Sequence, residues 1–134
     1  MLLPTPTLGI EPIEAAVNSS HWILQLAPDW DGEGSQSYDR AVWERATNFV
    51  LAQAKVLWET FGSRLDVPDI SPGPKGSIDV HWKTKRYELL INFPSGSNEM
   101  ATFYGDDYGS IEIEGTLNPK AEVPGLLIWL KQVV

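Results

Sequence analysis

The sequence contains no cysteine among its 134 residues. This absence excludes disulfide frameworks, thiolate zinc sites, iron–sulfur clusters and cysteine nucleophiles. There are only two histidines, and the chain contains no Walker loop, dinucleotide-binding fingerprint, G-x-S-x-G elbow or H-E-x-x-H motif. Most hydrolytic and redox schemes therefore lack the residues that they need. We expect a protein that is not an enzyme and that binds no cofactor.

Positive charge is also scarce, because 10 Lys and Arg residues face 18 Asp and Glu residues, for a net charge of −8. Nucleic-acid backbones bind clustered Lys and Arg, so direct nucleic-acid binding is disfavoured. A basic protein partner suits the charge, although the same charge also keeps proteins in solution. No apolar run approaches the roughly 18 residues of a membrane span, and no secretion signal is visible. We expect a cytoplasmic protein that does not contact membranes.

The helical pattern lies in the first half of the chain. Residues 1–11 are expected to form an irregular arm. Pro12 suits the first turn of a helix, which the apolar spacing predicts over Pro12–Leu26. A long helix follows a cap at Ser37 and ends at Gly62, a natural C-terminal stop. Its apolar face is formed by Val42, Ala46, Phe49, Val50, Leu57 and Phe61.

After a connection rich in proline and glycine, residues 66–76, apolar residues recur with a period of two, which predicts strands. A tight turn near Thr84 and Lys85 places Trp82 opposite Tyr87, and His81 opposite Glu88. The inner face of this hairpin is then formed by Ile78, Val80, Trp82, Tyr87, Leu89 and Ile91.

Two further strands are expected near Glu99–Gly105 and Ser110–Leu117, and a last helix from Pro124. Consecutive strands with short turns favour an antiparallel meander, whose apolar face needs cover from helices. The predicted fold is therefore α+β, within a single domain over residues 1–134. It has a short N-terminal helix, then a long helix and a C-terminal helix on one face of a four-stranded antiparallel sheet.

The segment Asp29–Gly34 is one candidate site. Asp29, Asp31 and Glu33 alternate around glycines, as in half of a calcium loop, because Ca²⁺ prefers several oxygen ligands on a sharply turning backbone. The third ligand pair and the bidentate glutamate of an EF-hand are missing. The alternative is a simple turn, with Trp30 buried as an anchor, and we expect no tight metal site.

The outer face of the predicted sheet is the other candidate. A His81–Glu88 pair there has the groups of a general base, but a solvated cross-strand pair is the simpler interpretation. If Tyr104 faces the core, Phe103 shares the outer face with Leu90, and a one-residue slip reverses this. An apolar strip ringed by acids is typical of a partner site. The candidate partner-binding residues are His81, Glu88, Leu90, Phe103, Glu112 and Glu114.

Three segments resemble a group of small bacterial proteins of unknown activity. These proteins have a W-D-G-x-G loop before a helix, then a G-x-I-x-x-x-W strand and an L-x-I strand. The matching residues here are Trp30–Gly34, Gly76–Trp82 and Leu89–Ile91. The similarity covers roughly Leu26 to Phe93, and it implies no activity for this chain.

The leading hypothesis is a non-catalytic interaction module of the accessory, immunity or antitoxin type, which binds another protein, basic in charge. Six tryptophans support it, because tryptophan anchors protein interfaces. Assembly of the chain into a homo-oligomer is compatible with the sequence. The alternatives are a small ligand- or metal-binding protein that uses the Asp29–Gly34 loop, and a carboxylate-dependent enzyme on the outer sheet face.

Overall fold

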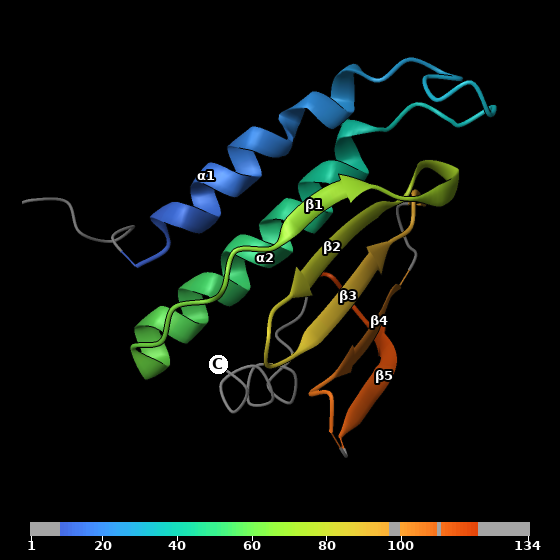
Figure 1. Cartoon of the computed structure of the whole chain (residues 1–134). Coiled ribbons are helices and arrows are strands. Elements are labelled where there is room, and N and C mark those ends of the chain that lie inside the picture. Colours follow the sequence, from blue (N-terminus) through green and yellow to red (C-terminus); the bar gives the residue numbers. More distant parts are fainter. Residues whose placement is uncertain (1–8, 97–99, 110, 121–134) are drawn as a thin grey trace, which may run out of the picture.

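The computed structural model describes residues 9–96, 100–109 and 111–120, which form two α-helices and a five-stranded antiparallel sheet (Figure 1). Each strand pairs with its neighbours in sequence, in the order β1-β2-β3-β4-β5. The α+β class and the antiparallel meander are confirmed, but the prediction of four strands is wrong. The elements are α1 (Glu11–Ser19), the 3-10 helix η1 (Ser20–Gln25), α2 (Arg40–Phe61), β1 (Asp69–Pro72), the 3-10 turn η2 (Pro74–Gly76), β2 (Ile78–Lys83), β3 (Glu88–Phe93), β4 (Ala101–Asp106) and β5 (Glu112–Leu117).

The additional strand is β1, in the segment that the sequence predicts as a connection. It pairs with β2, with Ile70 opposite Val80, and both α1 and η1 pack beside it. Pro72 closes the strand. Proline lacks the N–H that a central strand must donate, but it is tolerated at strand ends and on edges. The prolines therefore mark a short edge strand here rather than a loop.

The helix predicted over Pro12–Leu26 is divided in the structure. Glu11 begins α1 and Pro12 lies in its first turn. The helix tightens at Ser20, whose Oγ donates to the carbonyl of Val17 at 2.6 Å, and η1 follows. Serine competes for backbone hydrogen bonds in this way, which explains the break.

The long helix starts later than predicted, at Arg40 after Asp39, rather than at a Ser37 cap. It ends at Gly62, whose φ of 64° is the left-handed conformation that favours glycine, so this prediction is confirmed. In the described ranges of the chain no helix is long and apolar enough to span a membrane.

The predicted ends of the chain are only partly described. Of the irregular arm expected over residues 1–11, the structure describes Gly9 and Ile10, which form a buried turn, and Glu11, which begins α1. Residues 1–8 and the predicted helix from Pro124 lie outside the described residues.

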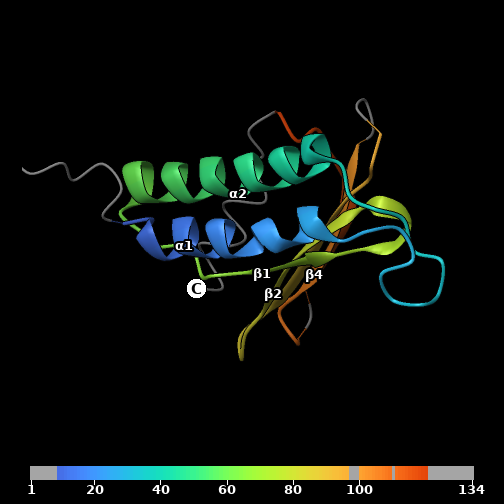
Figure 2. The same cartoon turned by 90° about the horizontal axis from the view of Figure 1, so that it is seen from above.

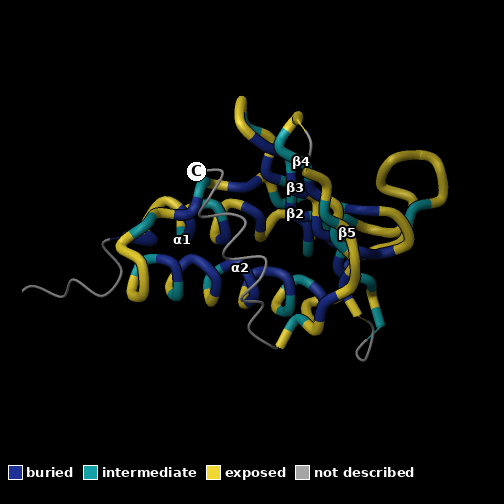
Figure 3. Tube along the Cα trace, turned by 90° about the horizontal axis from the view of Figure 1, so that it is seen from below, coloured by how far each residue is buried: buried dark blue, intermediate teal, exposed yellow. Residues whose placement is uncertain are grey.

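The core lies between the helices and one face of the sheet, which Figure 2 shows from above. Buried and exposed stretches alternate along α2 in Figure 3, as expected for an amphipathic helix. The rings of Phe49 and Phe93 lie 5.6 Å apart between α2 and β3. The strand residues that complete this inner face are Ile78, Val80, Trp82, Leu89, Ile91 and Phe93, all buried.

The inner residues of the β2–β3 hairpin were predicted correctly, but their partners were not. Trp82 lies opposite Leu89, and His81 lies opposite Leu90 rather than Glu88. The N–H of Thr84 donates to the carbonyl of Tyr87 at 2.9 Å, so Lys85 and Arg86 form the turn. Pairing is thus displaced by two residues, which leaves each side chain on its predicted face.

Asp66 joins the connection after α2 to this hairpin. Its carbonyl accepts the indole N–H of Trp82 at 2.7 Å, and its Oδ2 accepts the hydroxyl of Tyr87 at 2.8 Å. Both aromatic side chains are buried. Their polar atoms therefore find partners inside the fold, as buried tryptophan and tyrosine require.

Gln53 is a polar residue on the core side of α2, with only 3% of its surface exposed. Its Oε1 is buried and has no hydrogen-bond partner among the described residues. A buried acceptor without a partner destabilises the fold, whereas an apolar group of similar shape does not. We expect Gln53→Met to raise the free energy of unfolding by about 1 kcal/mol in urea denaturation.

The control is Gln25→Met on the exposed side of η1, which should change stability by less than about 0.5 kcal/mol. A loss of stability in Gln53→Met would show that the amide makes a stabilising contact.

Candidate functional site: the outer face of the sheet

The face of the sheet turned away from the helices is polar and rich in carboxylates. Strand residues alternate between the two faces, so the register assigns the members of this outer face. Among them the only lysine or arginine is Lys83, whereas every strand supplies at least one acid. The outer face consists of Asp69, Ser71, Asp79, His81, Lys83, Glu88, Leu90, Asn92, Thr102, Tyr104, Asp106, Glu112, Glu114 and Thr116.

An apolar centre lies in the middle of this face. Leu90 of β3 and Tyr104 of β4 are directly opposite each other and are 37% and 40% exposed. A shallow hollow of about 140 Å³ lies beside them, lined by Leu90, Asn92, Thr102, Phe103 and Tyr104. Leu90 and Tyr104 are the apolar and aromatic side chains that this outer face exposes.

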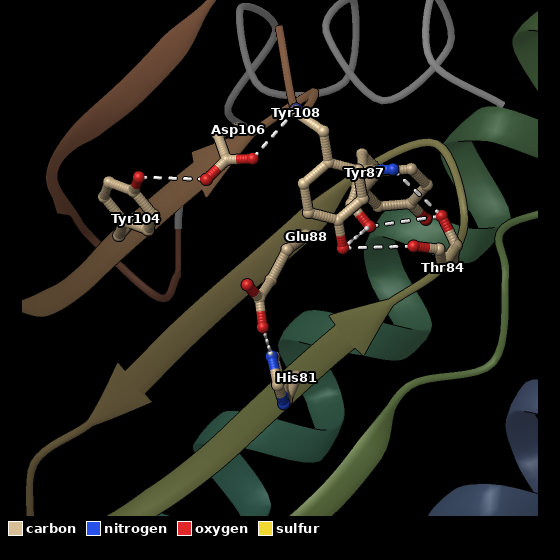
Figure 4. A network of polar contacts seen from close by, with 7 residues as sticks. All are labelled: His81, Thr84, Tyr87, Glu88, Tyr104, Asp106 and Tyr108. Carbon is tan, nitrogen blue, oxygen red and sulfur yellow. Dashed lines mark hydrogen bonds and ion pairs between the residues drawn. The ribbon is translucent and has the colours of Figure 1, made fainter.

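Tyr104 lies in a strongly negative environment. Its hydroxyl donates to Oδ2 of Asp106 at 2.9 Å (Figure 4). This bond, followed by partial desolvation and by the charges of Asp106, Glu112 and Glu88, raises the pKa of Tyr104 from 10.0 to about 12. Carboxylates from β3, β4 and β5 thus act together on one point of the face.

His81 and Glu88, which the sequence predicts as a cross-strand pair, are in hydrogen-bond contact. His81 Nε2 lies 2.6 Å from Glu88 Oε2 across β2 and β3, although the two residues are diagonal rather than opposite (Figure 4). Both side chains are about 30% exposed. Each therefore has a partner within the sheet, so the pair fixes side-chain positions on one flank of the apolar centre.

The other flank is fixed by an amide. Asn92 donates to Oδ1 of Asp79 at 2.8 Å and to Ser77 Oγ at 2.9 Å. At the opposite end of the sheet, Tyr108 donates its hydroxyl to the carbonyl of Thr84 at 3.1 Å (Figure 4). That bond ties the β4–β5 turn to the β2–β3 turn. The outer face is thus held by its own polar contacts around an exposed centre.

The structure brings together five of the six residues predicted as a partner site: His81, Glu88, Leu90, Glu112 and Glu114. The sixth, Phe103, was assigned to the wrong face. It lies opposite Ile91 and packs against the core. A Cβ added at Gly115 would lie 3.2 Å from its ring, which shows that the ring covers this glycine on the inner side.

Tyr104 occupies the place that Phe103 was expected to take. Strand β4 carries apolar or aromatic residues in both phases of the alternation, so a period of two did not decide which of them faces inward. The acid at Asp106, two residues after Tyr104, is the signal in the sequence that favours the observed phase.

The loop Asp29–Gly34 projects from one end of the molecule and is exposed (Figures 2 and 3). Its two aspartates bind the loop's own backbone. Oδ1 of Asp29 accepts the N–H of Gly34 at 2.6 Å, and Oδ1 of Asp31 accepts the N–H of Glu33 at 3.0 Å. Asp31 also accepts a hydrogen bond from the hydroxyl of Ser35. This bond, followed by the bond from the Glu33 N–H, lowers the pKa of Asp31.

No group of three or more potential metal ligands occurs in the part of the chain that the structure describes. The carboxylates of the loop instead act as turn-stabilising acceptors, a common role of aspartate. Trp30 is 40% exposed, and its ring lies 6.4 Å from that of Tyr38. The prediction that Trp30 is buried as a core anchor is therefore wrong.

Comparison with known proteins returns no match: no family model, no curated protein and no solved structure is similar to this chain.

Proposed function

We propose that the chain is a non-catalytic interaction module whose outer sheet face binds a basic protein. The observation that carries this proposal is the exposed pair of Leu90 and Tyr104 within a rim of carboxylates. An apolar centre with a charged rim is the usual anatomy of a protein interface. The accessory, immunity or antitoxin class, and a cytoplasmic location, which the cysteine-free sequence fits, are part of the proposal.

The carboxylates of the outer face determine which charge a partner must carry. Glu112 and Glu114 are exposed at the margin of the face, and Glu88 and Asp106 lie nearer the centre. Such an arrangement attracts a positively charged surface over distance and repels an acidic one. The apolar centre then supplies the short-range contacts that keep the partner bound.

The contribution of the apolar centre to partner binding is tested with Leu90→Ser. Because Leu90 is exposed, stability should change by no more than about 0.5 kcal/mol. Loss of a central anchor typically weakens a complex about tenfold or more. A partner captured from the native host by the wild-type chain would be purified, and its affinity for both chains measured by calorimetry. Equal affinities would move the binding site away from the outer face.

The contribution of the rim carboxylates to association is tested with a matched pair of charge reversals. Glu112→Lys lies on the outer face, and Glu59→Lys lies on the exposed side of α2, in the helix layer. Both remove the same charge, so only their positions differ. Glu112→Lys should slow association several-fold at low salt, and the difference should shrink as salt screens the attraction. Equal rates for the two variants would contradict a directed electrostatic interface.

A further inference from the structure

The two long edges of the sheet differ in how they are protected. At one edge, β1 is only four residues long, ends at Pro72, and has α1 and η1 beside it. At the other edge, β5 has six residues, and among the described residues no strand pairs with its outer side. Apart from Ile113 and Leu117, the residues of β5 are exposed. An edge of this kind is a template for a further strand.

The hydrogen-bond pattern identifies the backbone groups on that edge. The N–H of Asp107 donates to the carbonyl of Ile111 at 3.2 Å, so these two residues form a hydrogen-bonded pair. In antiparallel strands such pairs alternate with pairs that make no mutual bonds. Along β5, Ile113, Gly115 and Leu117 therefore bond to β4. The residues whose N–H and C=O groups point away from β4 are Glu112, Glu114 and Thr116.

The same three residues carry their side chains on the outer face. A strand added antiparallel to β5 would place its hydrogen-bonded residues opposite them, with side chains on the same face. Lysine or arginine at those positions would lie against Glu112 and Glu114. The intervening residues would lie on the inner side, near the half-buried Ile113 and the bare backbone of Gly115.

Charge disfavours two symmetric pairings of a second copy along the middle of this edge. A symmetric pairing centred on Glu114 places the two Glu114 side chains opposite each other, and one centred on Ile113 places Glu112 opposite Glu114. Like charges directly opposite are destabilising in a sheet. Charge complementarity instead favours a basic segment.

We propose that β5 accepts, as a sixth antiparallel strand, an extended segment of the partner in which basic residues alternate with apolar ones. This proposal rests on the proposed function, because it names the binding mode of the same basic partner. Main-chain hydrogen bonds to Glu112, Glu114 and Thr116 hold the segment, and the alternating side chains select it.

The probe is a short synthetic peptide in which lysine alternates with valine, together with two N-methylated forms. Methylation of the lysine nitrogens removes the N–H groups that face β5, whereas methylation of the valine nitrogens removes those that face away. The first form should bind about tenfold more weakly or worse, and the second within about twofold of the parent. Backbone amide signals of Glu112, Glu114 and Thr116 should shift on binding.

A matched pair of variants tests the protein side. Thr116→Pro removes an outward N–H without changing charge or breaking the ladder to β4, and Thr116→Val keeps that N–H. Only the proline variant should lose peptide affinity, by about tenfold. Unchanged affinity in a folded Thr116→Pro variant overturns the proposal. If the Thr116→Pro variant melts at a lower temperature, the proposal is tested by the affinities of the two methylated peptides for the wild-type chain.

The remaining outcomes separate this proposal from the proposed function. Equal binding of both methylated peptides, with shifts centred on Leu90 and Tyr104, overturns strand addition but leaves the outer face as the binding surface. Protection of the Glu114 amide from solvent exchange in the free protein overturns it, because the edge is then already covered. A dimer in sedimentation that Thr116→Pro abolishes overturns it in favour of a second copy.

Discussion

Replacing Trp82 with alanine is expected to lower the free energy of unfolding by about 3–5 kcal/mol. The indole is only 2% exposed and lies on the inner face of β2, opposite Leu89. Truncation removes a large buried apolar surface and leaves a cavity that its neighbours fill only partly. It also removes the donor to the carbonyl of Asp66. Urea denaturation followed by circular dichroism measures the change.

Trp22→Ala is the matched control, since the same side chain on η1 is 47% exposed. Its cost should stay below about 1 kcal/mol. Trp82→Phe separates the two contributions, because it keeps most of the buried volume but leaves the Asp66 carbonyl without its donor. A cost below about 1 kcal/mol for Trp82→Ala would contradict the position of this side chain in the core.

Above pH 10 the protein should lose stability more steeply than its Tyr87→Phe variant. Burial, the hydrogen bond to Asp66 and the charge of Asp66 raise the pKa of Tyr87 far above its ordinary value of 10.0. The folded state keeps the phenol protonated, whereas the unfolded chain ionises it above pH 10. The contribution of Tyr87 to the free energy of unfolding is therefore fully present below pH 10. Above pH 10 this contribution falls by about 1.4 kcal/mol per pH unit.

The comparison with Tyr87→Phe isolates this group from the other tyrosines. Tyr104, whose pKa is about 12, also titrates in this range, but it does so in both proteins. At pH 8 the variant should be the less stable protein, because Asp66 loses the donor that Tyr87 supplies. The gap between the two should narrow from pH 10 to 12. Parallel stability curves over that range would show that Tyr87 ionises as easily in the fold as in the unfolded chain.

The faces of β2 and β3 were predictable because their residues alternate cleanly. Ile78, Val80 and Trp82 are apolar and their neighbours are polar, so the pattern alone assigns the buried side. Pairing partners depend instead on the turn. The observed turn, Lys85–Arg86, lacks the glycine or asparagine that marks a two-residue hairpin, so the sequence left its position open.

The outer face could be predicted only in part, for two different reasons. In β4, Phe103 and Tyr104 are adjacent aromatic residues, so hydrophobicity does not distinguish their faces. The neighbouring strand decides, because Phe103 meets Ile91 and Tyr104 meets Leu90. In β1, the prolines conceal a strand that pairs with β2. Both features come from strand pairing, which single-sequence periodicity does not contain.

The exposure of Trp30 was also not predictable from the sequence pattern. A large aromatic residue between aspartates and glycines suggested an anchor beneath a turn, but the turn satisfies its own polar groups. The Asp29 and Asp31 side chains bond to backbone N–H groups within the loop, so the loop keeps its shape without burying Trp30. The six tryptophans therefore do not share one role, as the buried Trp82 and the exposed Trp22 and Trp30 illustrate.

The order of the strands also determines how quickly the chain can find this fold. Every strand is hydrogen-bonded to its neighbour in sequence, and the turns between Gly73 and Ser77, Thr84 and Tyr87, and Asp107 and Ile111 are short. Closing short loops costs little chain entropy. A sheet built from such local pairs has a lower contact order than a Greek key of the same size, and proteins of low contact order fold faster. The meander therefore favours rapid folding.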